Sequence, residues 1–177
     1  KVEKIVVSDS IVSGIITDKG RYEADAVIVC TGGLSYPATG STGDGLRFAE
    51  SLGIGTVKCI PALCGIVCDM RALKDLQGLS LKNVRVSAYE GSKCVSSFFG
   101  EMLFTHFGIS GPTVLSMSSE INRRSVEKLK ILIDLKPALD DETLDRRILR
   151  DFDKYSNKQL ANALIELLPK KLIAPVL

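Results

Sequence analysis

Residues 83–89 read Asn-Val-Arg-Val-Ser-Ala-Tyr, and residues 128–136 read Lys-Leu-Lys-Ile-Leu-Ile-Asp-Leu-Lys. Both stretches place apolar side chains at every second position. Because successive side chains of a strand point to opposite faces, this period of two predicts half-buried antiparallel strands. Residues 90–93 fit a hairpin turn before a strand at 95–99, and residues 102–105 predict a further strand. We therefore expect a small sheet or barrel.

Helices are predicted between and after these strands. Apolar residues recur with helical spacing at three places, which are Val114/Met117/Ile121, Leu144/Ile148/Phe152 and Leu160/Leu164/Leu167. Pro112 fits the first position of one helix, and residues 156–159, Ser-Asn-Lys-Gln, match a capping box. The second half of the chain therefore combines antiparallel strands with helices.

The first half of the chain starts with strand-like sequence. Residues 5–7, 12–17 and 21–23 predict a small antiparallel unit, with a turn at 17–20. Residues 26–30, Ala-Val-Ile-Val-Cys, are continuously apolar and end at Thr-Gly-Gly. Such a run predicts a strand buried on both faces of a layered α/β sheet.

A loop rich in glycine and hydroxyl residues follows at positions 34–45. It leads into a predicted helix over residues 42–53, in which Thr42 is the expected N-cap and Asp44 lies in the first turn. The loop has neither the lysine of a P-loop nor the G-x-G-x-x-G order of a dinucleotide fingerprint. Asp44 would repel a phosphate, so hydrogen bonds to ring edges or hydroxyls suit this loop better. A turn without any ligand is the alternative.

Composition narrows the class of protein. The 177 residues carry a formal charge of +2 with 25% charged residues, which is typical of globular proteins and disfavours disorder or a strongly electrostatic nucleic-acid binder. No apolar run approaches the ~20 residues of a membrane span. We expect no membrane partner and no nucleic-acid partner. The chain lacks an initiator methionine and leads directly into strand-like sequence, so we expect a piece of a longer protein.

The five cysteines and the single histidine limit the metal and disulfide chemistry. An odd number of cysteines in a chain of this size favours free thiols in a reducing compartment, so we expect a cytoplasmic protein. One histidine excludes a two-histidine zinc site, and the cysteine spacing does not suit a shared ion. We expect no metal site.

Four segments resemble known flavoproteins. Residues 25–33 resemble the strand and Thr-Gly-Gly turn of flavoproteins with two dinucleotide-binding domains. Residues 39–45 (Thr-Gly-Ser-Thr-Gly-Asp-Gly) and 100–112 (Gly-Glu-Met-Leu-Phe-Thr-His-Phe-Gly-Ile-Ser-Gly-Pro) resemble bacterial YhiN/BaiN-type NAD(P)/FAD-dependent oxidoreductases, and residues 168–172 are similar to a helix start there. The resemblance covers nearly the whole chain.

The resemblance implies an α+β fold in several parts. Residues 1–56 would be a piece of a Rossmann-like FAD-binding domain, and residues 57–137 a β-barrel-like insert domain with helices. Residues 138–177 would be its helical part, truncated. The family's pyrophosphate-binding G-x-G-x-x-G and its second FAD-contacting segment are absent from these residues. We therefore expect the remainder of the flavoprotein chain as a partner, and we expect this fragment alone to be inactive and to hold FAD weakly.

The resemblance also implies site residues. The expected cofactor-binding set is Thr31, Gly32, Gly33, Ser41, Thr42, Gly43 and Asp44. His106 is the candidate catalytic residue because imidazole is the side chain that ordinarily exchanges protons near neutral pH. The neighbouring aromatic residues, Phe104 and Phe107, argue equally that His106 is an ordinary half-buried histidine. For Glu101 and Ser110 the same two roles, catalytic or structural, are open. Five basic residues suit a solvent-exposed strand face better than a binding site for the phosphate of NADPH. They are Arg123, Arg124, Lys128, Lys130 and Lys136.

We expect a fragment of an FAD-dependent oxidoreductase that moves hydride or electrons between a small organic substrate and NAD(P)H or oxygen. FAD would be its cofactor in the full-length protein, with NAD(P)H as a further candidate. The alternative is a non-enzymatic, self-folding insert domain that serves as an interaction or assembly module. A nucleic-acid-binding barrel is disfavoured by the low net charge and by the lack of interleaved basic and aromatic residues.

Overall fold

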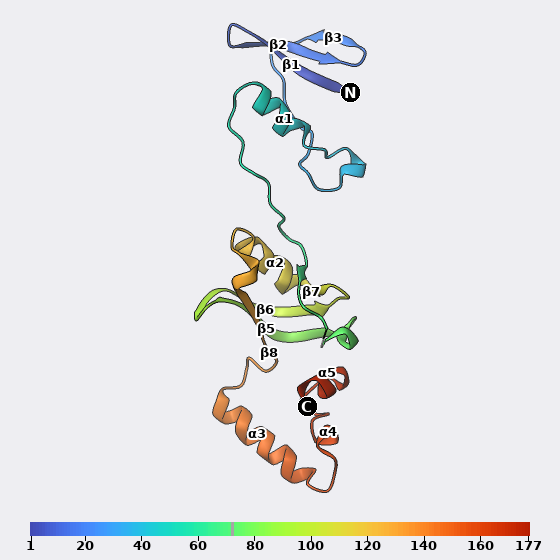
Figure 1. Cartoon of the computed structure of the whole chain (residues 1–177), viewed down its shortest axis with the longest axis vertical. Coiled ribbons are helices and arrows are strands. Elements are labelled where there is room, and N and C mark those ends of the chain that lie inside the picture. Colours follow the sequence, from blue (N-terminus) through green and yellow to red (C-terminus); the bar gives the residue numbers. More distant parts are fainter. Residues whose placement is uncertain (72) are drawn as a thin grey trace. The chain divides into compact units, whose positions relative to one another are not determined.

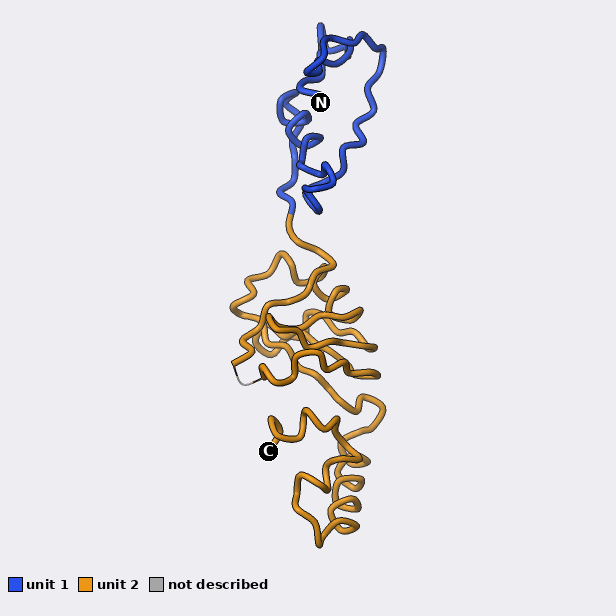
Figure 2. The backbone as a smooth tube through the Cα atoms, turned by 90° about the vertical axis from the view of Figure 1, so that its right-hand side faces the viewer, with its two compact units in different colours: residues 1–59 blue, residues 60–177 orange. Residues whose placement is uncertain are grey.

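The computed structural model describes residues 1–71 and 73–177. The chain divides into two compact units, residues 1–59 and 60–177 (Figure 2). Each unit has its own sheet, and the two are described separately below.

Unit 1 begins with three antiparallel strands in sequence order, β1 (Val2–Ser8), β2 (Ile11–Thr17) and β3 (Gly20–Glu23) (Figure 1). Gly14 makes the pairing of β2 with β3 possible, because a Cβ at this position would lie 2.0 Å from the carbonyl oxygen of Tyr22. The antiparallel unit and the turn at 17–20 that the sequence predicts are confirmed.

The strand predicted at residues 26–30 is wrong, since this segment belongs to no sheet. Most of its side chains are exposed, with Ile28 at 88% and Val29 at 45%. A strand needs a neighbour to pair its backbone N–H and C=O groups, and none of the described strands lies beside this segment. The apolar run therefore does not form the buried strand in this unit.

A single turn of 3-10 helix, η1 (Pro37–Thr39), lies within the glycine-rich loop, which leads into helix α1 (Asp44–Ser51). The helix is shorter than predicted, and Thr42 is not its N-cap. Gly43 takes that position with a φ of 80°, while the Thr42 hydroxyl donates to the Asp44 side chain at 2.9 Å. Asp44 lies in the first turn, as expected.

Unit 2 contains a curled, half-barrel sheet of five antiparallel strands in the order β4-β7-β6-β5-β8 (Figure 1). The strands are β4 (Ile66–Val67), β5 (Ser80–Glu90), β6 (Lys93–Phe104), β7 (Gly108–Ser110) and β8 (Leu129–Asp134). The two strands predicted at 95–99 and 102–105 are one continuous strand, β6. The period-two prediction for β5 and β8 is confirmed.

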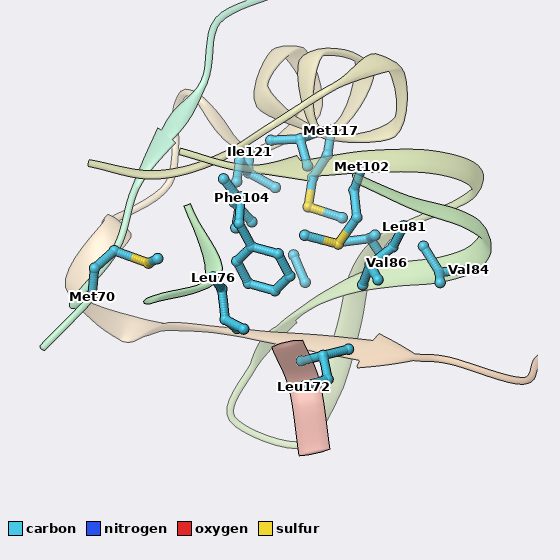
Figure 3. Close-up of a cluster of buried hydrophobic side chains, with 13 residues drawn as sticks. Met70, Leu76, Leu81, Val84, Val86, Met102, Phe104, Met117, Ile121 and Leu172 are labelled. Atoms are coloured by element: carbon cyan, nitrogen blue, oxygen red, sulfur yellow. The ribbon is translucent and has the colours of Figure 1, made fainter. Parts of the chain in front are cut away.

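Helix α2 (Pro112–Ile121) begins at Pro112 as predicted, and its Met117 and Ile121 point into the hydrophobic cluster beneath it (Figure 3). Its Val114 and Met117 are fully buried against Val86 and Met102 of the sheet. The Thr113 hydroxyl donates to the Glu101 carbonyl oxygen at 2.8 Å and ties the helix start to β6. This cluster is the core of unit 2.

Short helices complete unit 2. They are η2 (Lys74–Leu76), η3 (Val126–Lys128), α3 (Asp141–Lys154), α4 (Leu160–Ala163) and α5 (Lys170–Val176). Leu172 of α5 joins the core. The Asp140 side chain caps α3, whereas the capping box predicted before α4 makes no side-chain cap. The mixed α+β fold with a barrel-like sheet is confirmed.

Candidate functional site

The two glycine segments of unit 1 that the resemblance singles out fold against each other at the start of α1. The Gly43 N–H donates to the carbonyl oxygen of Gly33 at 3.1 Å. The Thr31 hydroxyl accepts a hydrogen bond from the Gly45 N–H at 3.0 Å. Residues 31–33 and 41–45 therefore form one cluster, which we call the glycine cluster. It contains all seven of the predicted cofactor-binding residues.

Glycine suits this cluster because side chains of the facing segment lie directly against its backbone. A Cβ on Gly32 would lie 2.5 Å from the Ser41 Oγ, and Gly32 also has a φ of 70°. A Cβ on Gly45 would lie 2.8 Å from the Thr31 Oγ1, where it would displace the hydrogen-bonding hydroxyl. A side chain at either position would displace the Ser41 or the Thr31 hydroxyl, and at Gly32 it would also have to adopt a positive φ.

Asp44 is the charged group of the cluster and is largely enclosed, with 14% of its side chain exposed. It accepts from the Thr42 hydroxyl and forms an ion pair with Arg47, while the Lys1 amine lies 4.0 Å away. The hydrogen bond from Thr42, together with the positive charges of Arg47 and Lys1, holds the pKa of Asp44 below its ordinary value. Asp44 is therefore a carboxylate at neutral pH.

The glycine cluster offers neutral donors beside a fixed negative charge. In the part of the chain that the structure describes, the N–H groups of Gly32 and Gly33 and the Ser41 hydroxyl make no hydrogen bond. Such donors fit the carbonyl oxygens of a ring edge or the hydroxyls of a sugar-like chain. The Asp44 carboxylate disfavours phosphate here, so the residues fit part of an FAD molecule other than its pyrophosphate.

His106, the predicted catalytic residue, lies in the turn between β6 and β7 of unit 2. It is exposed rather than half-buried, and its ring packs edge-on against Phe107 with centroids 5.0 Å apart. The neighbouring Thr105 hydroxyl is buried without a partner in the described residues. Glu101 lies on β6, with its carboxylate 3.9 Å from the Lys82 amine. His106 has no carboxylate partner in the described ion pairs, and its catalytic role stays a prediction.

One hollow among the described residues lies within unit 2 and was not predicted from the sequence. It is a cavity of about 790 Å³, which we call the half-barrel cavity. Its apolar lining includes Ile66, Met70, Phe104, Ile109, Ile131 and Ile133, and its polar lining is Asp69, Ser118, Asn122 and Lys130. The lining comes from β4, β6, β7, β8 and the end of α2. Residues so far apart in sequence give no local signal of a shared cavity.

The predicted free thiols are confirmed, because all five cysteines are unpaired in the structure. Cys64 and Cys68 line the half-barrel cavity, whereas Cys94 is exposed on β6. Partial burial raises the pKa of the Cys68 thiol. Within residues 1–71 and 73–177, no group of three metal-ligating side chains comes together, and no helix is long and apolar enough to cross a membrane.

Three basic residues of unit 2 differ in their ion pairs and in their position relative to the cavity. Arg124 is paired with Glu90 at 2.7 Å, so this arginine is not free to bind a phosphate. Lys128 is exposed outside the cavity lining, whereas Lys130 is an exposed residue that lines it. Lys130 forms no ion pair with any described residue.

Curated relatives match both units. The chain is 32% identical over 176 residues to a ribosomal RNA dihydrouridine synthase of Haemophilus influenzae, covering 98% of this chain and 41% of that protein. It is 30% identical over 149 residues to the protein of the same name from Escherichia coli, covering 84% and 35%. It is 28% identical over 165 residues to a 3-dehydro-bile acid delta(4,6)-reductase of Clostridium scindens, covering 92% and 40%.

The chain thus spans about two fifths of the length of the curated relatives it matches. A family model described as "HI0933-like protein barrel and H2TH domain" matches residues 60–177, which are the whole of unit 2. The curled sheet is the barrel part of that description. The chain belongs to the HI0933-like protein family, and unit 2 is its barrel and H2TH domain.

Proposed function

We propose that the protein to which these residues belong is a flavin-dependent oxidoreductase that reduces a carbon–carbon double bond conjugated to a carbonyl group. The observation that carries this proposal is the glycine cluster, in which two segments resembling flavoprotein sequence meet and present unpaired N–H donors. Family membership supports it, because the family's barrel and H2TH domain accounts for the rest of the chain.

The names of the relatives support the reaction class. Dihydrouridine is uridine with two hydrogens added across its ring double bond, which is conjugated to a carbonyl group. The third relative is named as a reductase of a 3-dehydro-bile acid, whose delta(4,6) double bonds are conjugated to the 3-oxo group. Each name therefore describes hydrogen addition to an electron-poor double bond.

In this proposal the chain's residues hold and orient the cofactor. A bound reduced flavin supplies a hydride to an electron-poor carbon. The N–H groups of Gly32 and Gly33 and the Ser41 hydroxyl would donate to oxygens of the cofactor, and Asp44 would keep the loop closed through Thr42 and Arg47. NAD(P)H as the electron source, and His106 as a proton donor, are parts of the proposal that the experiments below address.

The substrate is proposed to be a small organic molecule, which the half-barrel cavity could hold. The formal charge of +2 gives no support for an extended nucleic-acid surface. Uridine in ribosomal RNA is the second candidate, and the names of the two relatives at 32% and 30% identity favour it. Turnover assays of the full-length protein with each substrate class would separate the two.

The test of the flavin site is a pair of glycine substitutions in the full-length protein. Gly45→Ala places a methyl group against the Thr31 hydroxyl, whereas Gly55→Ala adds one where no atom lies within 4 Å. We expect G45A to weaken FAD binding by roughly tenfold or more, about 1.4 kcal/mol, and G55A to leave it unchanged. The readout is flavin absorbance and fluorescence quenching on titration.

Two outcomes would contradict this proposal. One is a full-length protein that binds no flavin, and the other is a G45A variant that binds FAD as tightly as the wild type. Loss of NAD(P)H oxidation in His106→Asn, with FAD binding retained, would support a role for His106 in turnover. The 177-residue chain is expected to bind FAD weakly by itself, so a stoichiometrically flavin-loaded sample of it would overturn that expectation.

A further inference from the structure

We propose that the outer face of the unit 2 sheet binds single-stranded RNA through aromatic rings and unpaired cations. The outer face is the side of β5, β6 and β8 that is turned away from the half-barrel cavity. The rings belong to Phe99 and Tyr89, and the cations to Arg85 and Lys130. The inference rests on the second candidate substrate of the proposed function, uridine in ribosomal RNA, and it adds the surface that would hold the strand.

The strand register places these four residues on one face. Arg85 of β5 pairs with Phe99 of β6, and Tyr89 of β5 pairs with Lys130 of β8. Directly paired residues share a face, with Cβ atoms about 4.5–5.5 Å apart. Arg85 and Tyr89 lie on the same face of β5 because they are separated by an even number of positions, about 13 Å along the strand. Each ring therefore has a cation as its direct neighbour.

This face is opposite the core and the half-barrel cavity. The residues that alternate with it along β5 and β8 pack into the core, and they are Val84, Val86, Ala88, Leu129, Ile131 and Ile133. Side chains alternate between the two faces of a strand. Lys130 borders the cavity as a residue, but its side chain lies on the outer face, between those of Tyr89 and Leu132.

The outer face exposes apolar surface. Phe99 is 58% exposed and Leu132 is 43% exposed. The row of residues between Phe99 and Tyr89 contains Ser87 and Ser97, whose hydroxyls hydrogen-bond to each other at 2.9 Å. Small side chains thus separate the two rings, which leaves room for a flat group above the sheet. Unpaired bases of single-stranded RNA stack on exposed aromatic side chains in this way.

The charges of this face suit a few phosphates. Arg85 and Lys130 form no ion pair with the described residues. Asp134 pairs with Arg85 in the register and offsets one positive charge, whereas Glu101 on β6 is 3.9 Å from the Lys82 amine. Charge alone would hold RNA weakly here, so stacking has to supply much of the affinity. Such a site is compatible with the formal charge of +2.

The sheet brings together what the sequence keeps apart. Basic and aromatic residues are not interleaved along the chain, which disfavours a nucleic-acid-binding barrel from sequence alone. On the outer face they come from three strands and become neighbours through pairing. A second copy of the chain, or the remainder of the flavoprotein chain, could also cover this apolar surface. Those two occupants are outcomes that the tests distinguish.

The first test measures binding of the 177-residue chain to a short fluorescein-labelled oligouridylate by fluorescence anisotropy. Phe99→Ala removes the ring, and Phe99→Tyr keeps one. Tyr22→Ala is the matched control, because Tyr22 is 53% exposed on β3 of unit 1. We expect F99A to weaken binding by about tenfold, and F99Y and Y22A to bind like the wild type. Annealing the probe to oligoadenylate pairs its bases and should weaken binding to the wild type.

The second test measures how this binding depends on salt. Each phosphate contact of a single strand adds about −0.7 to the slope of the logarithm of the association constant against that of the salt concentration. Two cations predict a slope of about −1.4 for the wild type, and Lys130→Met should reduce it to about −0.7. Arg21→Met is the control, because Arg21 is exposed on β3 and forms no ion pair with the described residues. Its slope should equal that of the wild type.

Thiol alkylation locates the RNA. Cys94 is exposed and pairs with Tyr89 in the register, so it lies on the outer face. Bound oligouridylate should slow alkylation of Cys94 and leave the exposed Cys30 and Cys59 of unit 1 unchanged. Mass spectrometry of the labelled peptides measures the three rates. In the full-length protein, Cys94 should react readily without RNA and be protected when RNA is bound.

Several results would overturn the proposal. They are equal binding by F99A and the wild type, equal losses in F99A and Y22A, an unchanged salt slope in K130M, and equal affinity for the paired and the single strand. Protection of Cys94 without RNA would also overturn it, whether it comes from concentration-dependent dimerisation or from the remainder of the full-length chain. None of these readouts uses FAD or turnover, so the flavin proposal and this one fail separately.

Discussion

Asp44 shows how one side chain sets the start of α1. The sequence places it in the first helical turn, where a negative charge interacts favourably with the helix dipole. The structure adds the Thr42 hydroxyl and the Arg47 guanidinium as its partners. Thr42 was predicted to cap the helix backbone, but Gly43 takes that position in a left-handed conformation that a residue with a Cβ adopts less easily.

Removing the Asp44 charge should destabilise unit 1 in a pH-dependent way. Its pKa is lower in the native state than the ordinary 3.8, so ionisation favours folding. This stabilisation is complete well above pH 3.8 and is lost as the pH falls through the lower native pKa. We expect Asp44→Asn to lower the free energy of unfolding at pH 7 and to differ less from the wild type near pH 3.

The measurement is urea unfolding followed by amide NMR signals of residues 1–59, at several pH values. Asp25→Asn is the matched control, because Asp25 is exposed and forms no ion pair with the described residues. A difference between wild type and D44N that stays constant from pH 7 to pH 3 would contradict the proposed role of the ionised carboxylate.

Strand β6 shows where local pattern is misleading. Two strands are predicted, at residues 95–99 and 102–105, with an interruption at Gly100 and Glu101, yet the strand continues through both residues and pairs Gly100 with Val84. A Cβ on Gly100 would lie 3.1 Å from the Thr113 methyl group, so the missing side chain leaves room for α2. The interruption marks a helix contact and not a strand end.

Two residues of β6 should respond differently to truncation. Met102 is fully buried in the core, so we expect Met102→Ala to lower the free energy of unfolding by about 2–5 kcal/mol. Phe99 lies on the same strand with 58% of its surface exposed, so Phe99→Ala should change it by less than about 1 kcal/mol. Chemical denaturation followed by circular dichroism measures both. Equal losses would show that β6 is not packed as described.

At the scale of the whole chain, the buried side chains are unevenly divided. The main hydrophobic cluster lies entirely within unit 2, from Met70 to Leu172. Unit 1 buries few apolar side chains, namely Ile5 and Phe48. The boundaries predicted from the resemblance, at residues 56 and 137, stay a prediction. The structure divides the described residues between 59 and 60.

This difference in burial predicts independent folding of one unit. Residues 60–177 expressed alone should give a dispersed amide NMR spectrum that overlays on the unit 2 signals of the whole chain, because their core is self-contained. Residues 1–59 alone should unfold at a lower urea concentration than residues 60–177, because two buried apolar side chains contribute little against chain entropy. A higher urea midpoint for residues 1–59 than for 60–177, or a collapsed spectrum from 60–177, would contradict this view.

The sequence by itself determined the elements whose signals are local. The alternation of apolar and polar residues identified β5 and β8, and the helical spacing of apolar residues after Pro112 identified α2. The segments that resemble flavoproteins identified the residues of the glycine cluster. Family membership confirms the resemblance at the level of the barrel and H2TH domain.

Only the tertiary structure decided which of these elements pair and what space they enclose. The apolar run at residues 26–30 has a strand-like composition, but pairing depends on a neighbouring strand that composition does not reveal. The half-barrel cavity depends in the same way on strands and a helix distant in sequence. Local patterns report which face of an element is apolar, whereas a cavity arises from contacts between elements.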